Sequence, residues 1–110
     1  MKTTDEVKRV LVACDLRRAN SVAVADYLNI STSTLRRKLR SEGSSFQKLL
    51  DEERVYRCYL RISENPRLLS KQIYNELGYA TPNSFCRSFK RNWGVDFQKY
   101  KISIRARLLE

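Results

Sequence analysis

An internal repeat constrains the fold of this chain more than any other sequence feature. Four residues recur 49 positions later, so that Ser21, Val24, Leu28 and Ile30 match Ser70, Ile73, Leu77 and Tyr79. After one extra residue the offset becomes 50, and Leu35, Arg37, Leu39 and Arg40 match Phe85, Arg87, Phe89 and Lys90. After a second extra residue the offset becomes 51, and Gly43 and Phe46 match Gly94 and Phe97. This register indicates two consecutive units of one structural plan.

The basic stretch from Ser31 to Arg40 predicts an amphipathic helix in the first unit. Ser31 is a favourable N-cap residue. Leu35 and Leu39 lie four residues apart and form a face that packs on the protein. The outward face carries Ser33, Arg36, Arg37 and Arg40. Such a face suits a DNA major groove, because arginine pairs bidentately with guanine O6 and N7. The alternative is a solvated surface helix that binds nothing.

A short helix is predicted just before this one, capped by Asn20 or Ser21. It would bury Val24, Ala25 and Leu28, and a turn over 29–31 would lead into the basic helix. A short helix, a tight turn and a second amphipathic helix make a helix-turn-helix. A packing helix over 4–15 is expected to precede it, and Gly43 is expected to follow the basic helix as a residue with positive φ.

The second unit is predicted to repeat this plan. Ser70 is expected to cap its first helix, and Thr81 its second, with Pro82 at the first helical position. Phe85 and Phe89 would face the core. The outward positions of this second helix are Asn83, Cys86, Arg87 and Lys90. A last helix is expected from about Asp96.

The two units are joined by the longest predicted helix, over about 46–63. Ser44 or Ser45 would cap it and Asn65-Pro66 would stop it. Its length of roughly 27 Å approaches the rise of one DNA turn. The sequence therefore predicts an all-α fold of about seven helices: a first subdomain over 1–44, a linker helix over 45–65 and a second subdomain over 66–110.

Composition narrows the function to polyanion binding. The 110 residues hold 22 basic against 12 acidic side chains, a net charge of +10, which favours nucleic acid as the partner. The absence of histidine removes the usual general base and the commonest metal ligand. We expect no enzymatic activity, no metal and no cofactor.

Three widely spaced cysteines and the lack of a long apolar run predict a cytosolic, cytoplasmic protein with reduced thiols and no membrane contact.

These residues resemble the signature of the AraC/XylS-type bacterial transcription regulators. The likeness runs from about Val7 to Lys101. It is strongest over Gly78-Tyr79, 85–90 and 94–100, and looser over 28–46. The sequence departs from the family pattern at Phe97, where proline is usual, at Tyr74, where a small residue is common, and at Arg61, where leucine is usual. The resemblance implies two helix-turn-helix units whose second helices, about 32–42 and 82–93, enter successive major grooves of double-stranded DNA.

The resemblance also implies roles for single residues. The expected base contacts are Ser33, Arg36, Arg37, Asn83, Cys86 and Arg87, and the expected phosphate contacts are Ser21, Arg40, Ser70, Lys71 and Lys90. Cys86 is equally interpretable as a half-buried packing thiol, and Arg54 as a structural residue paired with a carboxylate. RNA polymerase is an expected partner, and an effector or dimerisation domain is expected outside this chain.

Three alternatives stay open. A basic helical adaptor for other proteins would show an apolar patch outside the core, and the sequence shows none clearly. A non-specific nucleic-acid binder would share the charge but not the base contacts. A shape-based RNA binder would expose stacking aromatic rings, whereas Phe85, Phe89, Trp93 and Tyr100 lie at core spacing.

Overall fold

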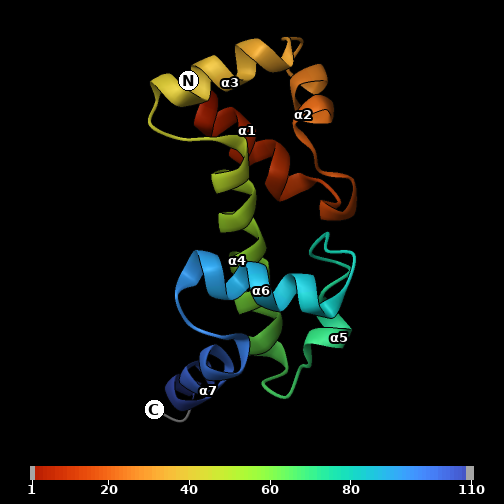
Figure 1. Ribbon diagram of the computed structural model, residues 1–110, viewed down its shortest axis with the longest axis vertical. Coiled ribbons are helices and arrows are strands. Elements are labelled where there is room, and N and C mark those ends of the chain that lie inside the picture. Colours follow the sequence, from red (N-terminus) through yellow and green to blue (C-terminus); the bar gives the residue numbers. More distant parts are fainter. Residues whose placement is uncertain (1, 109–110) are drawn as a thin grey trace. The chain divides into compact units, whose positions relative to one another are not determined.

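A computed structural model describes residues 2–108, and every regular element in that range is helical. The elements are α1 (Thr3–Ala13), the 3-10 turn η1 (Leu16–Arg18), α2 (Ser21–Tyr27), α3 (Thr32–Ser41), α4 (Phe46–Glu64), α5 (Ser70–Ile73), α6 (Pro82–Trp93) and α7 (Phe97–Leu108). Figure 1 shows their order along the chain. The predicted all-α fold with seven α-helices is confirmed.

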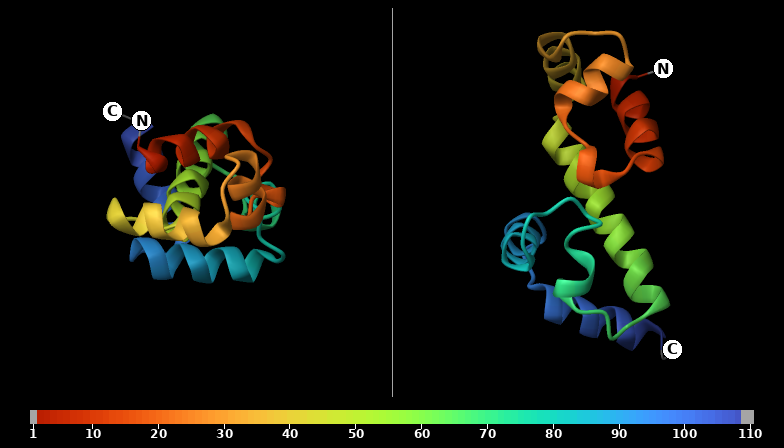
Figure 2. Two further views of the ribbon diagram at one scale, coloured as in Figure 1. Left: turned by 90° about the horizontal axis from the view of Figure 1, so that it is seen from above. Right: turned by 90° about the vertical axis from the view of Figure 1, so that its right-hand side faces the viewer.

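The chain divides into two compact units, one up to Glu53 and the other from Arg54. The division falls inside α4, which is one continuous helix. In the first unit α1, α2 and α3 gather around the start of α4, and in the second α5, α6 and α7 gather around its end (Figure 2).

Apolar side chains at helical spacing form a separate core in each unit. The buried residues of the first unit are Val7, Leu11, Leu16, Val24, Ala25, Leu35, Leu39, Leu49 and Leu50. Those of the second are Cys58, Ile62, Leu68, Ile73, Leu77, Phe85, Phe89, Phe97 and Ile104. Both helix-turn-helix pairs therefore pack through positions that the repeat predicted, except that Leu28, which was expected to be buried, is only half-buried.

The turn between the two helices of each pair has the same geometry in both units. Asn29 (φ 60°) and Gly78 (φ 92°) hold the left-handed position of the two turns. The Ile30 N–H donates to the Ala25 carbonyl at 3.0 Å, and the Tyr79 N–H donates to the Tyr74 carbonyl at 3.0 Å. The offset of 49 residues thus holds for backbone conformation as well as for side-chain type.

Most predicted helix ends are confirmed. The Ser31 hydroxyl accepts from the Thr34 N–H at 3.1 Å, and the Thr81 hydroxyl from the Ser84 N–H at 3.0 Å. Of the alternatives left open, Asn20 caps α2 and Ser45 caps α4, since the side-chain oxygen of each accepts a backbone N–H from the first turn. These contacts satisfy donors that the helix itself leaves free.

Three expectations were wrong. Leu69, not Ser70, occupies the N-cap of α5; its side chain accepts no hydrogen bond, and Gln72 Oε1 instead accepts the Leu69 N–H at 2.8 Å. The first helix ends at Ala13, because Asp15 caps η1 by accepting from the Arg17 N–H. Trp93 is 43% exposed, since it ends α6 at the rim of the core.

Candidate nucleic-acid interface

The outer face of α3 is cationic from its second turn onward. Leu35 and Leu39 are buried, and Arg36, Arg37, Lys38 and Arg40 are all exposed. Because successive residues turn by about 100°, Arg37 lies opposite the buried face, Ser33 and Arg40 lie beside it, and Arg36 lies further round on the same flank. The helix therefore presents these donors over one continuous outer surface.

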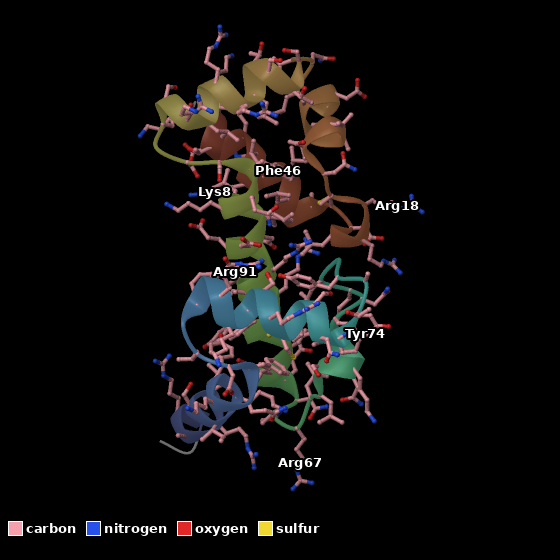
Figure 3. The ribbon with its side chains drawn as sticks, viewed as in Figure 1. Lys8, Arg18, Phe46, Arg67, Tyr74 and Arg91 are labelled. Atoms are coloured by element: carbon pink, nitrogen blue, oxygen red, sulfur yellow. The ribbon has the colours of Figure 1, made fainter. Side chains whose placement is uncertain are left out.

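The flank with Arg36 and Arg40 forms one wall of a cleft of about 410 Å³. Ser21 lines the same cleft from the start of α2, and Ser45, Phe46 and Gln47 line it from the start of α4. Figure 3 labels Phe46 at the first turn of that helix. The structure thus brings together two expected phosphate contacts, Ser21 and Arg40, with one expected base contact, Arg36.

The sequence did not predict that Ser45 and Gln47 would join this group. The repeat contained a usable signal, because both residues directly flank Phe46, which pairs with Phe97 at the 51-residue offset. Their position follows from the sharp corner at Gly43 (φ 75°), which brings the start of α4 beside the end of α3.

The outer face of α6 follows the same geometry with weaker charge. Phe85 and Phe89 are buried, and Asn83 and Arg87 lie opposite them and are exposed. Cys86 is half-buried, so its sulfur contributes both to packing and to the surface. Of the expected phosphate contacts in this unit, Lys71 and Lys90 are exposed and Ser70 is half-buried.

A chain of polar contacts fixes the position of α6 on its unit. The Arg54 Nε donates to the Leu77 carbonyl at 2.8 Å, and its guanidinium lies 4.2 Å from the centroid of the Tyr79 ring. The Tyr79 hydroxyl lies 3.1 Å from the Ser88 Oγ, which also accepts from Asn92 at 3.2 Å. Arg54 therefore has a structural role, because it contacts the Leu77 carbonyl and the Tyr79 ring.

A second long-range contact fixes the end of α3. The Glu42 carboxylate follows α3 and accepts from the Thr4 N–H at 2.8 Å and from the Thr3 N–H at 3.1 Å. It caps the start of α1 from almost forty residues away. These hydrogen bonds, that of Thr4 first, lower the pKa of the Glu42 carboxyl.

The first unit also has an apolar groove of about 430 Å³, which the sequence did not predict. Val10 and Ala13 line it from α1, Cys14 from the residue after α1, and Tyr27 and Leu28 from the end of α2. The charged side chains Glu6 and Arg9 complete the lining. Tyr27 is 73% exposed. This groove is the kind of surface that an adaptor for other proteins would need.

Other types of site find no support among residues 2–108. No group of three His, Cys, Asp or Glu side chains there could hold a metal ion. No helix in that range is long and apolar enough to cross a membrane. Burial raises the pKa of the Cys58 thiol to about 12, so this cysteine stays protonated at neutral pH.

Comparison with known proteins places these features in a wider group. The model of the "Helix-turn-helix domain" family matches residues 24–102. The HTH-type transcriptional activator CsvR of Escherichia coli is 33% identical over 92 residues, covering 84% of this chain and 34% of that protein. The DNA-binding dual transcriptional regulator Rns of the same organism is 33% identical over 93 residues, with the same coverage. The chain thus spans about a third of the length of these relatives.

Two solved structures share the fold. A crystal structure of a DNA-binding transcriptional dual regulator from Escherichia coli K-12 matches 96% of this chain and 95% of its own with a TM-score of 0.81 at 24% identity. The transcriptional regulator CdpR from Pseudomonas aeruginosa matches 90% of this chain and 31% of its own with a TM-score of 0.81 at 27% identity.

Proposed function

This chain belongs to the AraC/XylS-type helix-turn-helix family of bacterial transcription regulators, and from that premise we propose that it binds specific sequences in double-stranded DNA. In this proposal α3 and α6 enter successive major grooves. The observation that carries the proposal is the repeated face: each helix follows a turn of the same geometry, buries two large apolar side chains and presents donors on the opposite side.

Base recognition is assigned to the side chains opposite the buried faces. Arg37 and Arg87 suit guanine, because a guanidinium donates to O6 and N7 together, and Asn83 suits adenine N6 and N7. Ser33 contacts either kind of base, and Cys86 contacts a thymine methyl group. Arg36 is assigned to a base as well, although its place in the cleft also gives it access to the backbone.

Backbone contacts position the protein without reading sequence. They are assigned to Ser21 and Arg40 in the first unit and to Ser70, Lys71 and Lys90 in the second. The exposure of Arg40, Lys71 and Lys90 and the place of Ser21 in a cationic cleft support this assignment.

Selection of bound duplexes from a random pool, followed by footprinting of the selected sequence, tests the proposal. Two protected stretches of major groove about 10 base pairs apart are expected. Recovery of unrelated duplexes with no shared sequence would instead identify a non-specific binder.

The apolar groove between α1 and α2 supports a second candidate function, contact with another protein. RNA polymerase is the proposed partner, together with an effector or dimerisation domain outside these residues, and a cytoplasmic location fits both. Family membership and the exposed Tyr27 support this proposal. If it holds, Tyr27→Ala will lower activated transcription in a reaction with purified polymerase while leaving DNA affinity unchanged.

A further inference from the structure

The corner between α3 and α4 has the composition of an anion site. Arg36 and Arg40 bring two guanidinium groups to its cleft, and Ser45 and Gln47 bring a hydroxyl and an amide. The Gln47 Nε2 also donates to the Asp51 Oδ1 at 2.9 Å, so one of its two N–H groups is engaged and the other is the donor for a ligand. The residues that line this cleft, all within the described range, include no carboxylate. A phosphodiester oxygen is an acceptor that this set of donors fits.

The second unit has a corner of the same local geometry. Gly94 (φ 73°) stands where the first unit has Gly43 (φ 75°), and Phe97 is buried where Phe46 begins α4. In both units the residue directly before this phenylalanine caps the next helix. Ser45 Oγ accepts from the Lys48 N–H at 3.1 Å, and Asp96 Oδ1 accepts from the Lys99 N–H at 2.8 Å. Asp96 therefore takes the place of Ser45.

The charges at the two corners differ. By the offsets of the repeat, Cys86 replaces Arg36 and Lys90 replaces Arg40, so one guanidinium is lost and the other becomes an ammonium. The Asp96 carboxylate replaces the Ser45 hydroxyl. Two cations and a neutral cap in the first unit thus become one cation and an anion in the second.

The total charges of the two units differ in the opposite sense from the charges at their corners. Residues 1–53 carry ten basic and eight acidic side chains, whereas residues 54–110 carry twelve basic and four acidic. Total charge alone would therefore favour stronger backbone contacts by the second unit. The local composition of the corners instead favours stronger backbone contacts by the first unit.

We propose that the α3–α4 corner of the first unit binds a backbone phosphate of double-stranded DNA, and that the Asp96 carboxylate prevents the matched corner of the second unit from doing the same. This inference rests on the DNA binding proposed above. According to this inference, Ser45 and Gln47 contact a DNA phosphate. Asp96 weakens the binding of the second unit to the DNA backbone.

Exchange of the two capping residues tests the inference without disturbing the helices, because Ser, Asp and Asn are all favourable N-caps. A carboxylate beside a phosphate repels it, so Ser45→Asp is expected to weaken affinity by about tenfold and to reduce the salt slope by about one phosphate contact. Ser45→Asn removes the hydroxyl without adding charge, and a loss of no more than about threefold is expected.

The reverse change is a gain of function. Asp96→Asn is expected to tighten binding by about three- to tenfold, since it removes a repulsion and keeps the cap. Asp5→Asn alters the total charge by the same amount in the first turn of α1, and an affinity within about twofold of the wild type is expected. All variants are measured on a duplex recovered by selection with the wild-type chain.

Two results would overturn the inference: equal losses for Ser45→Asp and Ser45→Asn, or no more gain for Asp96→Asn than for Asp5→Asn. Circular dichroism of each variant establishes that it is folded. Failure of the wild-type chain to bind any selected duplex is a different outcome, because it would refute the proposed function itself.

Discussion

Aromatic side chains close the core of the second unit around Phe97. The ring centroid of Phe97 lies 4.9 Å from that of Phe85 and 5.9 Å from that of Phe89, both edge-on, and Phe97 is 2% exposed. This position usually holds proline in the family. Phe97 lacks the conformational rigidity of proline, but its buried ring packs edge-on against two other rings, and such contacts are favourable.

A second departure from the family is explained by an ion pair. Arg61 stands where leucine is usual, and its Nε lies 2.8 Å from the Glu76 Oε1. Its Nη1 is 3.6 Å from the Glu64 Oε2. The Glu76 carboxylate raises the pKa of the Arg61 guanidinium. Since each of the three side chains keeps at least 42% of its surface exposed, the ion pair adds little to stability.

The outward arginines carry the prediction that bears most directly on recognition. Arg37→Ala and Arg87→Ala are each expected to weaken specific binding by about 1–3 kcal/mol and to relax the choice at one base pair, because each removes a bidentate donor. Titration of the selected duplex and of its single-base variants measures both effects. The matched control is Lys38→Ala, which removes an exposed cation from another side of α3. Affinity and selectivity like those of this control would contradict the assignment.

Lys101 is a buried cation whose partners can be tested separately. It is 7% exposed, its Nζ donates to the Leu68 carbonyl at 2.8 Å, and the ammonium lies 5.1 Å from the centroid of the Phe97 ring. Lys101→Ala removes the packed stem as well as the hydrogen bond, and we expect the free energy of unfolding to fall by about 2–3 kcal/mol. Lys101→Met keeps the stem, so a fall of about 1 kcal/mol is expected. Urea denaturation at neutral pH measures both, and equal losses would show that the stem contributes nothing.

At the scale of elements, Glu42 ties the end of α3 to the start of α1. Its pKa is lowered from the usual 4.5 because the Thr4 and Thr3 N–H groups donate to the carboxylate. A carboxyl whose pKa is lower in the folded chain stabilises the fold above its unfolded pKa, and this contribution is lost as the pH falls through the folded value.

The wild type is therefore expected to lose more thermal stability than Glu42→Gln as the pH is lowered from about 6 to about 3, because only the wild type loses a carboxylate cap. Melting temperatures across this range measure the difference. Glu52→Gln, at an exposed position of α4, makes the same change of charge without removing these hydrogen bonds. Parallel curves for all three proteins would show that the tie contributes nothing to stability.

The elements that could be predicted are those fixed by nearby residues. Ser31, Thr81 and Pro82 mark helix starts, and Gly43 and Gly94 mark helix ends, because capping and positive φ depend on local chemistry. The Glu42 tie spans 38 or 39 residues, and no local pattern indicates it. The N-cap of the four-residue α5 was predicted one residue too late, at Ser70, because the Leu69 N–H is satisfied by the Gln72 side chain, a pairing that the preference for serine at N-caps does not reveal.

The candidate interface could be predicted in part for the same reason. The outward positions of Arg37 and Arg87 follow from helical periodicity alone. The cleft does not, because it depends on how the ends of three helices meet at one corner, which is a tertiary property. The apolar groove beside Tyr27 was missed because its lining comes from two helices whose packing periodicity suggested a fully covered face.

At the scale of the whole molecule, the net charge of +10 governs how binding responds to salt. Each phosphate neutralised by a cation releases condensed counterions, so the logarithm of the affinity should fall with the logarithm of salt concentration by about 0.9 per phosphate contact. Three of the five expected phosphate contacts, Arg40, Lys71 and Lys90, are cations, so a slope of about −3 or steeper is expected. Titrations over a range of potassium chloride concentrations measure it, and a flat response would point to a partner other than nucleic acid.

The chain of contacts from Arg54 through Tyr79 and Ser88 to Asn92 has a consequence for the cost of recognition. Rotation of α6 about its own axis would break the hydrogen bond between Ser88 on that helix and the Tyr79 hydroxyl, whose ring lies against the Arg54 guanidinium. The orientation of Asn83 and Arg87 is therefore settled when the unit folds, and little rotational freedom of the helix remains to be lost when a duplex arrives. Discrimination between bases in this unit then depends on the fit of rigid donors to a groove, with no need for the helix to reorganise.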